Sequence, residues 1–342
     1  MAAELLDLSP DSNIVKIYIY YSYVTCIISW ILAILLFYVI FTKSKSIGSF
    51  KWLILNHTIW VIAQETTFAL TKPVALSPYF AGYQVGILSN TGFQSTVIAV
   101  IILVATTFNV ITGMMMTMFN RYTVLFPSTW QRIFHSKLAL FVIVIFHVII
   151  ISWGFIYILP ILNYSSDYFH TEAIHQDPDF VHFMNESTFF FVNYKHIVFG
   201  CHIFILGTII CIGGCILLTG VFLHQLRKNH QAHHINDEVQ RSLFVTVLVQ
   251  SLTACFFVLG LPFMINNTAT ACLIIFVIQC TYSSCDLIAT LYFVVPYREF
   301  VLETIFRRKK KDSITRISMI ANQAQTVQHS NAFQKSVKSS SK

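Results

Sequence analysis

The chain has 342 residues, of which 56% are hydrophobic and only 11% are charged, whereas a soluble domain carries roughly 25% charged residues. This composition excludes a soluble globular protein and predicts an integral membrane protein. The net charge of +7 does not indicate nucleic-acid binding, because ten of the 22 Lys and Arg residues lie at or after Arg298. A basic tail of this kind faces a membrane surface.

The first 15 residues contain three acidic residues and no Lys or Arg, and the apolar run that follows is too long for a cleaved signal peptide. We therefore expect the first span to act as an uncleaved anchor. All eight cysteines fall in apolar segments, which favours buried packing over a disulfide framework. No CxxC or Cys/His ligand spacing occurs, so we predict neither a metal site nor a cofactor.

A membrane helix needs about 20 apolar residues, and on that rule the sequence predicts an all-α membrane protein, a seven-transmembrane-helix bundle. The stretch from Lys72 to Asn90 is apolar but interrupted by prolines and glycines, so we expect a loop on the outer face. A short amphipathic helix at 297–306 ends the predicted domain of residues 1–306, and a basic, disordered tail covers 307–342. The expected spans are about 17–42, 50–71, 92–120, 138–160, 196–225, 241–265 and 271–295.

Charge asymmetry predicts the orientation of these spans. If the N-terminus is outside, 19 of the 22 basic residues lie on the inner side, and only Lys16, Lys72 and Lys195 lie outside. Short inner loops rich in Lys and Arg are typical of a cytoplasmic face. Three glycosylation sequons fall in the predicted outer loops: Asn163, Asn185 and Asn266. We therefore expect an N-terminus outside and a cytoplasmic C-terminus.

The third span ends in Asn120-Arg121-Tyr122, after an apolar run without any charge. In seven-helix receptors the third helix ends in this way, and the arginine there faces the cavity that receives a G protein. The alternative is that Arg121 and Tyr122 only anchor the helix at the interface. Residues at the neighbouring inner ends complete the predicted coupling and switch site: Arg227, Lys228, Arg241, Pro296, Tyr297 and Arg298.

Two acids lie inside spans, where they are costly and usually face a cavity or a partner. Glu65 lies about 22 Å from the inner end of its span, and Asp286 about 15 Å. We therefore expect Glu65 in the outer half, where a ligand would bind, and no pairing between the two. Asn109, about 18 Å from the inner end, could face Asp286. Glu65 could instead be a protonated acid that is hydrogen-bonded between helices. The predicted ligand-lining residues are Glu65, Gln94, Gln279 and Tyr282.

Two other functions remain as alternatives. His230, His233 and His234 spell HxxHH, a spacing used by membrane enzymes of lipid metabolism, because histidines one turn apart can share a metal or act as acid and base. A single box in a polar loop favours a solvated His-rich loop instead. A small-solute transporter would show an internal repeat between halves, which the sequence lacks.

Gly200, Gly207 and Gly214 favour close helix packing over a dimer face, although a receptor oligomer stays open.

Several stretches spread over about positions 50 to 300 together resemble nematode seven-transmembrane chemoreceptors of the Str superfamily, most closely the serpentine receptor class H, with class I as a close relative. They are Leu53-Ile-Leu-Asn-His57, Lys72-Pro73, Ser77-Pro78-Tyr79, Ala81-Gly82-Tyr83, Phe119-Asn120-Arg121-Tyr122, Gln240-Arg-Ser-Leu-Phe244 and Pro296-Tyr297-Arg298.

The resemblance implies an olfactory-type G protein-coupled receptor in the plasma membrane of a sensory neuron's cilium, and no enzyme activity. The partners that we expect are a heterotrimeric G protein, a small-molecule ligand and membrane lipids. Two features of rhodopsin-like receptors are missing. No cysteine lies between Cys26 and Cys201, so the usual disulfide from helix 3 is absent. An NPxxY motif is absent as well, since Val295-Pro296-Tyr297-Arg298 is a different pattern.

Overall fold

The computed structural model of the chain describes residues 8–44, 50–125, 137–230 and 269–304. The chain forms two compact units, Met1–Tyr297 and Arg298–Lys342. The described part of the second unit, Arg298 to Thr304, is helical. The first unit contains the helix bundle.

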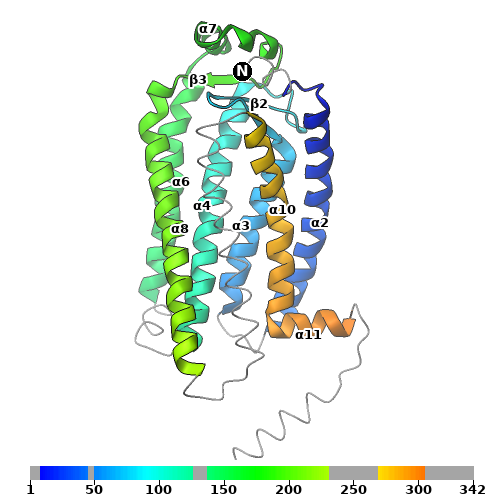
Figure 1. Cartoon of the computed structure of the whole chain (residues 1–342), viewed down its shortest axis with the longest axis vertical. Coiled ribbons are helices and arrows are strands. Elements are labelled where there is room, and N and C mark those ends of the chain that lie inside the picture. Colours follow the sequence, from blue (N-terminus) through cyan, green and yellow to red (C-terminus); the bar gives the residue numbers. More distant parts are fainter. Residues whose placement is uncertain (1–7, 45–49, 126–136, 231–268, 305–342) are drawn as a thin grey trace, which may run out of the picture. The chain divides into compact units, whose positions relative to one another are not determined.

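Six long helices run alongside one another in the first unit (Figure 1). They occupy six of the seven expected spans, and the remaining span, 241–265, lies outside the described residues. Three of them are long and apolar enough to cross a membrane, over Asn13–Lys43, Phe93–Asn120 and Cys272–Tyr292. The six helices are α2 (Asn13–Lys43), α3 (Phe50–Thr71), α4 (Phe93–Leu125), α6 (Lys137–Ile158), α8 (Tyr194–His230) and α10 (Ala269–Phe293). A short helix, α11 (Val295–Thr304), follows α10.

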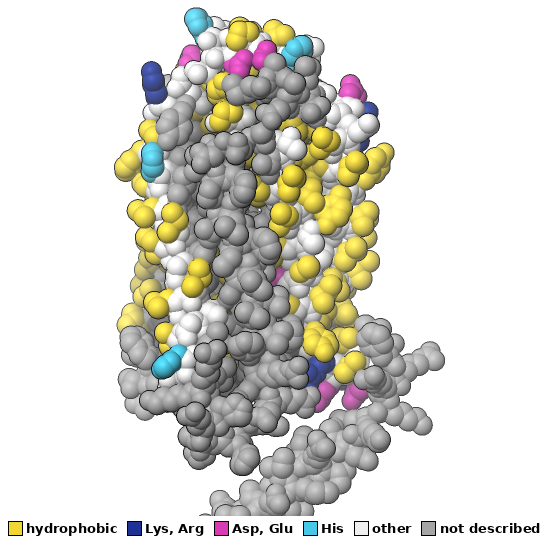
Figure 2. Space-filling view, in the orientation of Figure 1, with side chains coloured by type: hydrophobic (Ala, Val, Ile, Leu, Met, Phe, Trp, Pro, Cys, Tyr) yellow, Lys and Arg dark blue, Asp and Glu magenta, His cyan; other side chains and the backbone are white. Residues whose placement is uncertain are grey.

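On the face drawn in Figure 2, apolar side chains are prominent on the described outer surfaces of the bundle, as expected where a helix meets lipid. On α2, for example, Ile17, Ile27 and Ile31 are each more than half exposed, whereas Ser22 and Ser29 are fully buried. This is the reverse of a soluble amphipathic helix. The polar side of α2 therefore faces protein, and its apolar side faces outward.

A small sheet and short helices cover one end of the bundle (Figure 1). Strands β1 (Pro73–Ala75), β2 (Phe80–Gln84) and β3 (Phe190–Val192) form an antiparallel sheet in the order β1-β2-β3. Val74 pairs with Tyr83, and Ala81 pairs with Phe191. The expected loop from Lys72 to Asn90 is thus a hairpin and not an eighth span. Between α6 and β3 lie η2 (Leu159–Asn163), α7 (Ser166–Gln176) and η3 (Pro178–Phe183). We call residues 72–90 and 159–193 the outer cap.

Aromatic rings hold the outer cap together. Tyr79 meets Phe180 edge-on at 5.1 Å between ring centroids, and Phe180 meets Phe191 at 5.5 Å. The Tyr79 hydroxyl donates to the Asp177 carboxylate at 3.2 Å, and burial together with this carboxylate raises the pKa of Tyr79, so the hydroxyl keeps its proton. Buried Leu8 joins the same core, and its carbonyl accepts a hydrogen bond from the Tyr83 hydroxyl.

Gly86 lets the cap lie directly on the end of α3. A Cβ atom at this position would lie 2.1 Å from the carbonyl oxygen of Leu70, which is a backbone clash. Without a side chain, the Gly86 amide donates to the Thr71 carbonyl at 3.0 Å, and the Leu88 amide donates to the Leu70 carbonyl at 3.2 Å. These two bonds satisfy carbonyls that the end of a helix leaves without partners.

We predict that Gly86→Ala destabilises the protein by about 1–3 kcal/mol, the usual cost of forcing atoms into a packed site. The control is Gly213→Ala in α8, where an added Cβ has no neighbour within 4 Å. That change should be neutral or slightly stabilising, since Ala is the better helix former. Thermal unfolding of the purified protein compares the two. Equal midpoints for both variants would show that the cap does not need this close approach.

Candidate functional site

The centre of the candidate site is a polar run in α10, where eight consecutive residues from Gln279 to Asp286 read QCTYSSCD. Consecutive residues of a helix point in different directions, so polar groups occur all round α10 over this stretch. A polar side chain inside a membrane needs a partner within the protein. The run therefore requires polar neighbours on more than one side.

Helix α2 supplies partners on one side of α10. The Tyr21 hydroxyl and the Thr281 hydroxyl are 2.5 Å apart, and the hydroxyls of Ser29 and Ser284 are 2.8 Å apart. The Cys280 thiol donates weakly to the Ser22 hydroxyl at 3.9 Å. These contacts join residues about 260 positions apart in the chain, and they fix the rotation of α10 against α2.

Helix α3 supplies partners on another side, at the level of two predicted ligand-lining residues. Gln279 donates from Nε2 to the Gln64 side-chain oxygen at 3.1 Å, and Gln64 in turn donates to the Thr107 hydroxyl of α4 at 2.6 Å. Tyr282 packs with Val61 and Val110 in a small buried cluster. One chain of side chains therefore connects α10, α3 and α4.

Glu65 is next to Gln64 and is only 1% exposed. Ser283 and Thr25 lie beside its carboxyl group, yet neither carboxyl oxygen has a partner with hydrogen-bonding geometry among the described residues. A buried carboxyl group without partners is costly, so this is a place where a bound molecule could add a contact. Gln94, the fourth predicted lining residue, is exposed in the first turn of α4 and stands apart from this group.

Deeper in the bundle, His57 and Asp286 form a buried pair with Nε2 and Oδ2 3.0 Å apart and both side chains at most 3% exposed. The sequence led us to compare Asp286 only with Glu65 and Asn109. Asn109 instead donates to the Ala105 carbonyl of its own helix at 2.8 Å. A search for any titratable residue at the depth of Asp286, rather than for acids alone, would have included His57.

Gly113 of α4 makes room for this pair. A Cβ at Gly113 would lie 3.0 Å from His57 Nδ1, so α4 packs against the imidazole ring. The pair thus lies where α3, α4 and α10 meet.

At the opposite end from the outer cap, the predicted coupling residues lie in several helices. Asn120 is buried, and the ring of Tyr122 is 6.5 Å from that of Phe222 in α8, centroid to centroid. Tyr297 is fully buried, with its hydroxyl 2.7 Å from that of Ser44 at the end of α2. The backbone places Arg121 in α4, Arg227 and Lys228 in α8, and Pro296 in α11; Arg298 begins the second unit, and Arg241 lies outside the described residues.

Two predicted glycosylation residues, Asn163 and Asn185, are exposed in the outer cap, and Asn266 lies outside the described residues. His230 is the last residue of α8, and the rest of the HxxHH box lies outside the described residues as well. Across the four described ranges, no group of three or more His, Cys, Asp or Glu side chains could hold a metal ion.

Comparison with known proteins assigns the fold and the family. Residues 15–307 match the family described as "Serpentine type 7TM GPCR chemoreceptor Srh". The chain belongs to this Srh family. The structure of this Srh chain is also similar to that of squid rhodopsin, with a TM-score of 0.52 over 85% of each chain and 13% sequence identity. At that identity the likeness concerns the fold alone. No curated protein matches the sequence.

These findings confirm the family that the sequence motifs indicated and the seven-helix receptor fold. They place the Srh chain in a family of the membrane-receptor type. Its fold is that of rhodopsin, although no cysteine is available for the rhodopsin-like disulfide. Of the cysteines described, Cys26, Cys272, Cys280 and Cys285 are free thiols.

We predict that the His57–Asp286 pair is strongly coupled. Replacing either residue by Leu should cost about 3–5 kcal/mol, because it leaves the other polar group buried and unpaired. The double variant should cost less than the sum of the two single variants. The control cycle uses Lys16→Gln and Asp11→Asn, an exposed pair 3.8 Å apart, for which we expect no measurable coupling. Thermal unfolding in lipid nanodiscs gives both cycles, and strictly additive losses at the buried pair would contradict the prediction.

Proposed function

We propose that this Srh chain is a G protein-coupled chemosensory receptor that binds a small environmental ligand in the outer half of the bundle. The observation that carries the proposal is the match to a chemoreceptor family over residues 15–307. The polar, buried interface between α3 and α10 supports it, since an acid inside a membrane span, such as the buried Glu65, usually faces a cavity or a partner. We propose neither enzyme activity nor a cofactor.

In this proposal, the ligand acts by changing how α10 is held. A molecule that contacts Glu65, Gln279 or Tyr282 competes with the Gln279–Gln64 hydrogen bond or adds to it. A ligand shifts a conformational equilibrium only through its different affinities for the two states. A bond between two helices that bear the ligand site supplies such a difference. The His57–Asp286 pair lies further along the same two helices, where it carries a movement of α10 toward the other end.

The output side of the proposal is the end of α4. Arg121 lies in the last turns of α4 and is the one charged residue of that helix, next to buried Asn120 and to Tyr122, whose ring contacts α8. A guanidinium group presents a planar fork of donors that can bind carbonyl groups of a partner protein, which an ammonium group cannot imitate. Arg227, Lys228, Pro296 and Tyr297 belong to the same proposed surface for a heterotrimeric G protein, and Arg241 and Arg298 are predicted to contribute from the sequence alone.

The functional test is a ligand screen in cells that report calcium or cyclic nucleotide, with volatile and water-soluble compounds. Once an active compound is found, Arg121→Ala should lower its potency by about tenfold or more, equal to about 1.4 kcal/mol, at normal surface expression. Arg121→Lys should fail as well, because Lys lacks the planar fork. If Arg121 were only an interfacial anchor, Arg121→Lys would signal normally. Normal signalling from both variants would remove this residue from the output site.

We also propose a plasma-membrane location in the cilium of a sensory neuron, with the N-terminus outside and the C-terminus in the cytoplasm. The exposed sequon residues Asn163 and Asn185 in the outer cap agree with this orientation, as does the excess of Lys and Arg in the expected inner loops. Epitope tags at both ends, stained with and without permeabilisation, give the orientation. We expect only the N-terminal tag to stain on intact cells, and staining of the C-terminal tag on such cells would reverse the topology.

A further inference from the structure

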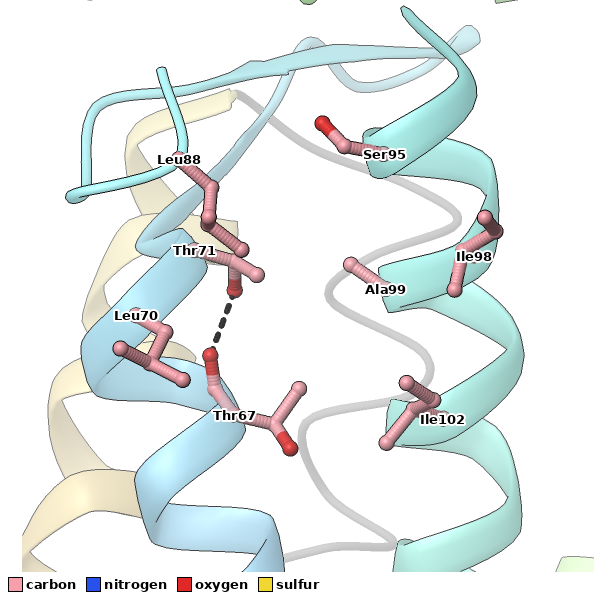
Figure 3. Close-up of a pocket in the computed structure, with 8 residues that line it drawn as sticks. All are labelled: Thr67, Leu70, Thr71, Leu88, Ser95, Ile98, Ala99 and Ile102. Atoms are coloured by element: carbon pink, nitrogen blue, oxygen red, sulfur yellow. Dashed lines mark hydrogen bonds between the residues drawn. The ribbon is translucent and has the colours of Figure 1, made fainter. Parts of the chain in front are cut away.

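A lateral groove lies between the outer parts of α3 and α4, and Figure 3 shows the residues that line it. Its volume is about 210 Å³. Leu88 of the outer cap covers it from above, held in place by the bond from its amide to the Leu70 carbonyl. The lining residues are Thr67, Leu70 and Thr71 of α3, Leu88, and Ser95, Ile98, Ala99 and Ile102 of α4.

The groove offers a ligand neither a charged group nor a hydroxyl group that is free to donate a hydrogen bond. Its lining contains no charged residue, and its three hydroxyl groups donate within the protein. Thr67 donates to the Ala63 carbonyl at 2.8 Å, and Thr71 donates to the Thr67 carbonyl at 2.8 Å. Ser95 donates to the Gly92 carbonyl at 2.9 Å and accepts from the Thr91 hydroxyl. A polar ligand would therefore lose its hydrogen bonds to water on entry without gaining strong new ones.

The groove opens on the side of the bundle, where the helices meet lipid. Three of its lining residues are partly exposed on that side: Leu70 at 38%, Ile98 at 46% and Ile102 at 42%. The outer end of the bundle, in contrast, is covered by the cap, whose buried core continues into Phe93, Val97 and Ile101 of α4. A molecule dissolved in the bilayer can reach the groove without passing the cap.

We propose that this groove binds a small, uncharged, apolar molecule that enters from the bilayer. A water molecule occupies about 30 Å³ in the liquid, so the groove holds roughly seven groups of that size. Drug-sized ligands fill pockets of about 300–1,000 Å³, which makes the occupant smaller than those. A short alkane, or another volatile compound of about that size that dissolves readily in lipid, fits this description.

The groove is next to the side chains that connect the helices. Thr67 is three residues from Gln64, so the two lie on neighbouring positions of one face of α3. Gln64 bonds Thr107 of α4 and Gln279 of α10. A molecule that separates α3 and α4 at the groove would therefore strain a link to α10. The inference rests on the proposed receptor function for this consequence, but binding itself can be measured without any signalling.

The test uses the purified full chain in lipid nanodiscs and a photoactivatable hexyl diazirine as the probe. We expect the probe to label peptides that contain Leu88, Ile98 or Ile102, and excess hexane to suppress that labelling. Hexylamine and hexanoate, which carry charges, should not suppress it. Ala99→Phe places a ring in the groove and should reduce labelling by about tenfold or more. A tenfold reduction corresponds to a loss of about 1.4 kcal/mol in the free energy of binding.

Two further variants keep the proposal falsifiable. Ile31→Phe on the outward side of α2, at a residue 62% exposed, adds the same ring away from the groove and should leave labelling unchanged. Ser95→Ala should also leave it unchanged, because that hydroxyl already donates within the protein. Reduced labelling in Ser95→Ala would show that the occupant uses the hydroxyl and would overturn the apolar assignment.

Other outcomes also overturn the proposal. Undiminished labelling of Ala99→Phe would place the probe elsewhere. Labelling of the same peptides by a diazirine-bearing phosphatidylcholine, unaffected by hexane, would assign the groove to the bilayer's own acyl chains. Specific labelling without any cellular response to hexane would leave the groove proposal standing and would count against the receptor proposal instead, so the two can be told apart.

Discussion

The structure depends on the need of polar side chains in a membrane interior to find partners within the protein. Helix α10 has the strongest requirement for such partners, because its polar run from Gln279 to Asp286 lies between apolar turns. Lipid provides no hydrophobic force that would press helices together. The hydrogen bonds to Tyr21, Ser29, Gln64 and His57 therefore determine where α10 sits and how it is rotated.

The outer cap joins three segments that are far apart in the chain, namely the segment around Leu8 and residues 72–90 and 159–193. It does so with no disulfide among the described cysteines. Aromatic pairs such as Phe93 with Phe169, at 5.0 Å, contribute about 0.5–1.5 kcal/mol each beyond the area they bury. Many such contacts replace a single covalent bond. The restraint is therefore spread over many contacts in the cap.

Hydropathy was sufficient to predict the long helices and the position of the 72–90 segment outside them, because length and apolar composition carry that information. The hairpin was missed because Phe80–Gln84 is buried on both faces, so the alternation typical of a strand is absent. The Asp286 partner was missed because a lone His57 in an apolar helix shows no pattern. The prediction grouped Glu65, Gln279 and Tyr282 only by their depth along the predicted spans. Depth along a span gives no direction around the helix, so it could not indicate that Gln94 is exposed.

The burial of Leu8 has a consequence for biogenesis. Its partner Tyr83 follows it by 75 residues in the chain, and Phe183, its neighbour in the cap core, follows it by 175 residues. The segment around Leu8 can therefore reach its final contacts only after α2, α3, α4 and α6 have been synthesised. Only when β3 pairs with β2 can the segment settle into its site. Cap assembly thus depends on contacts between residues far apart in the chain, which form more slowly than local contacts.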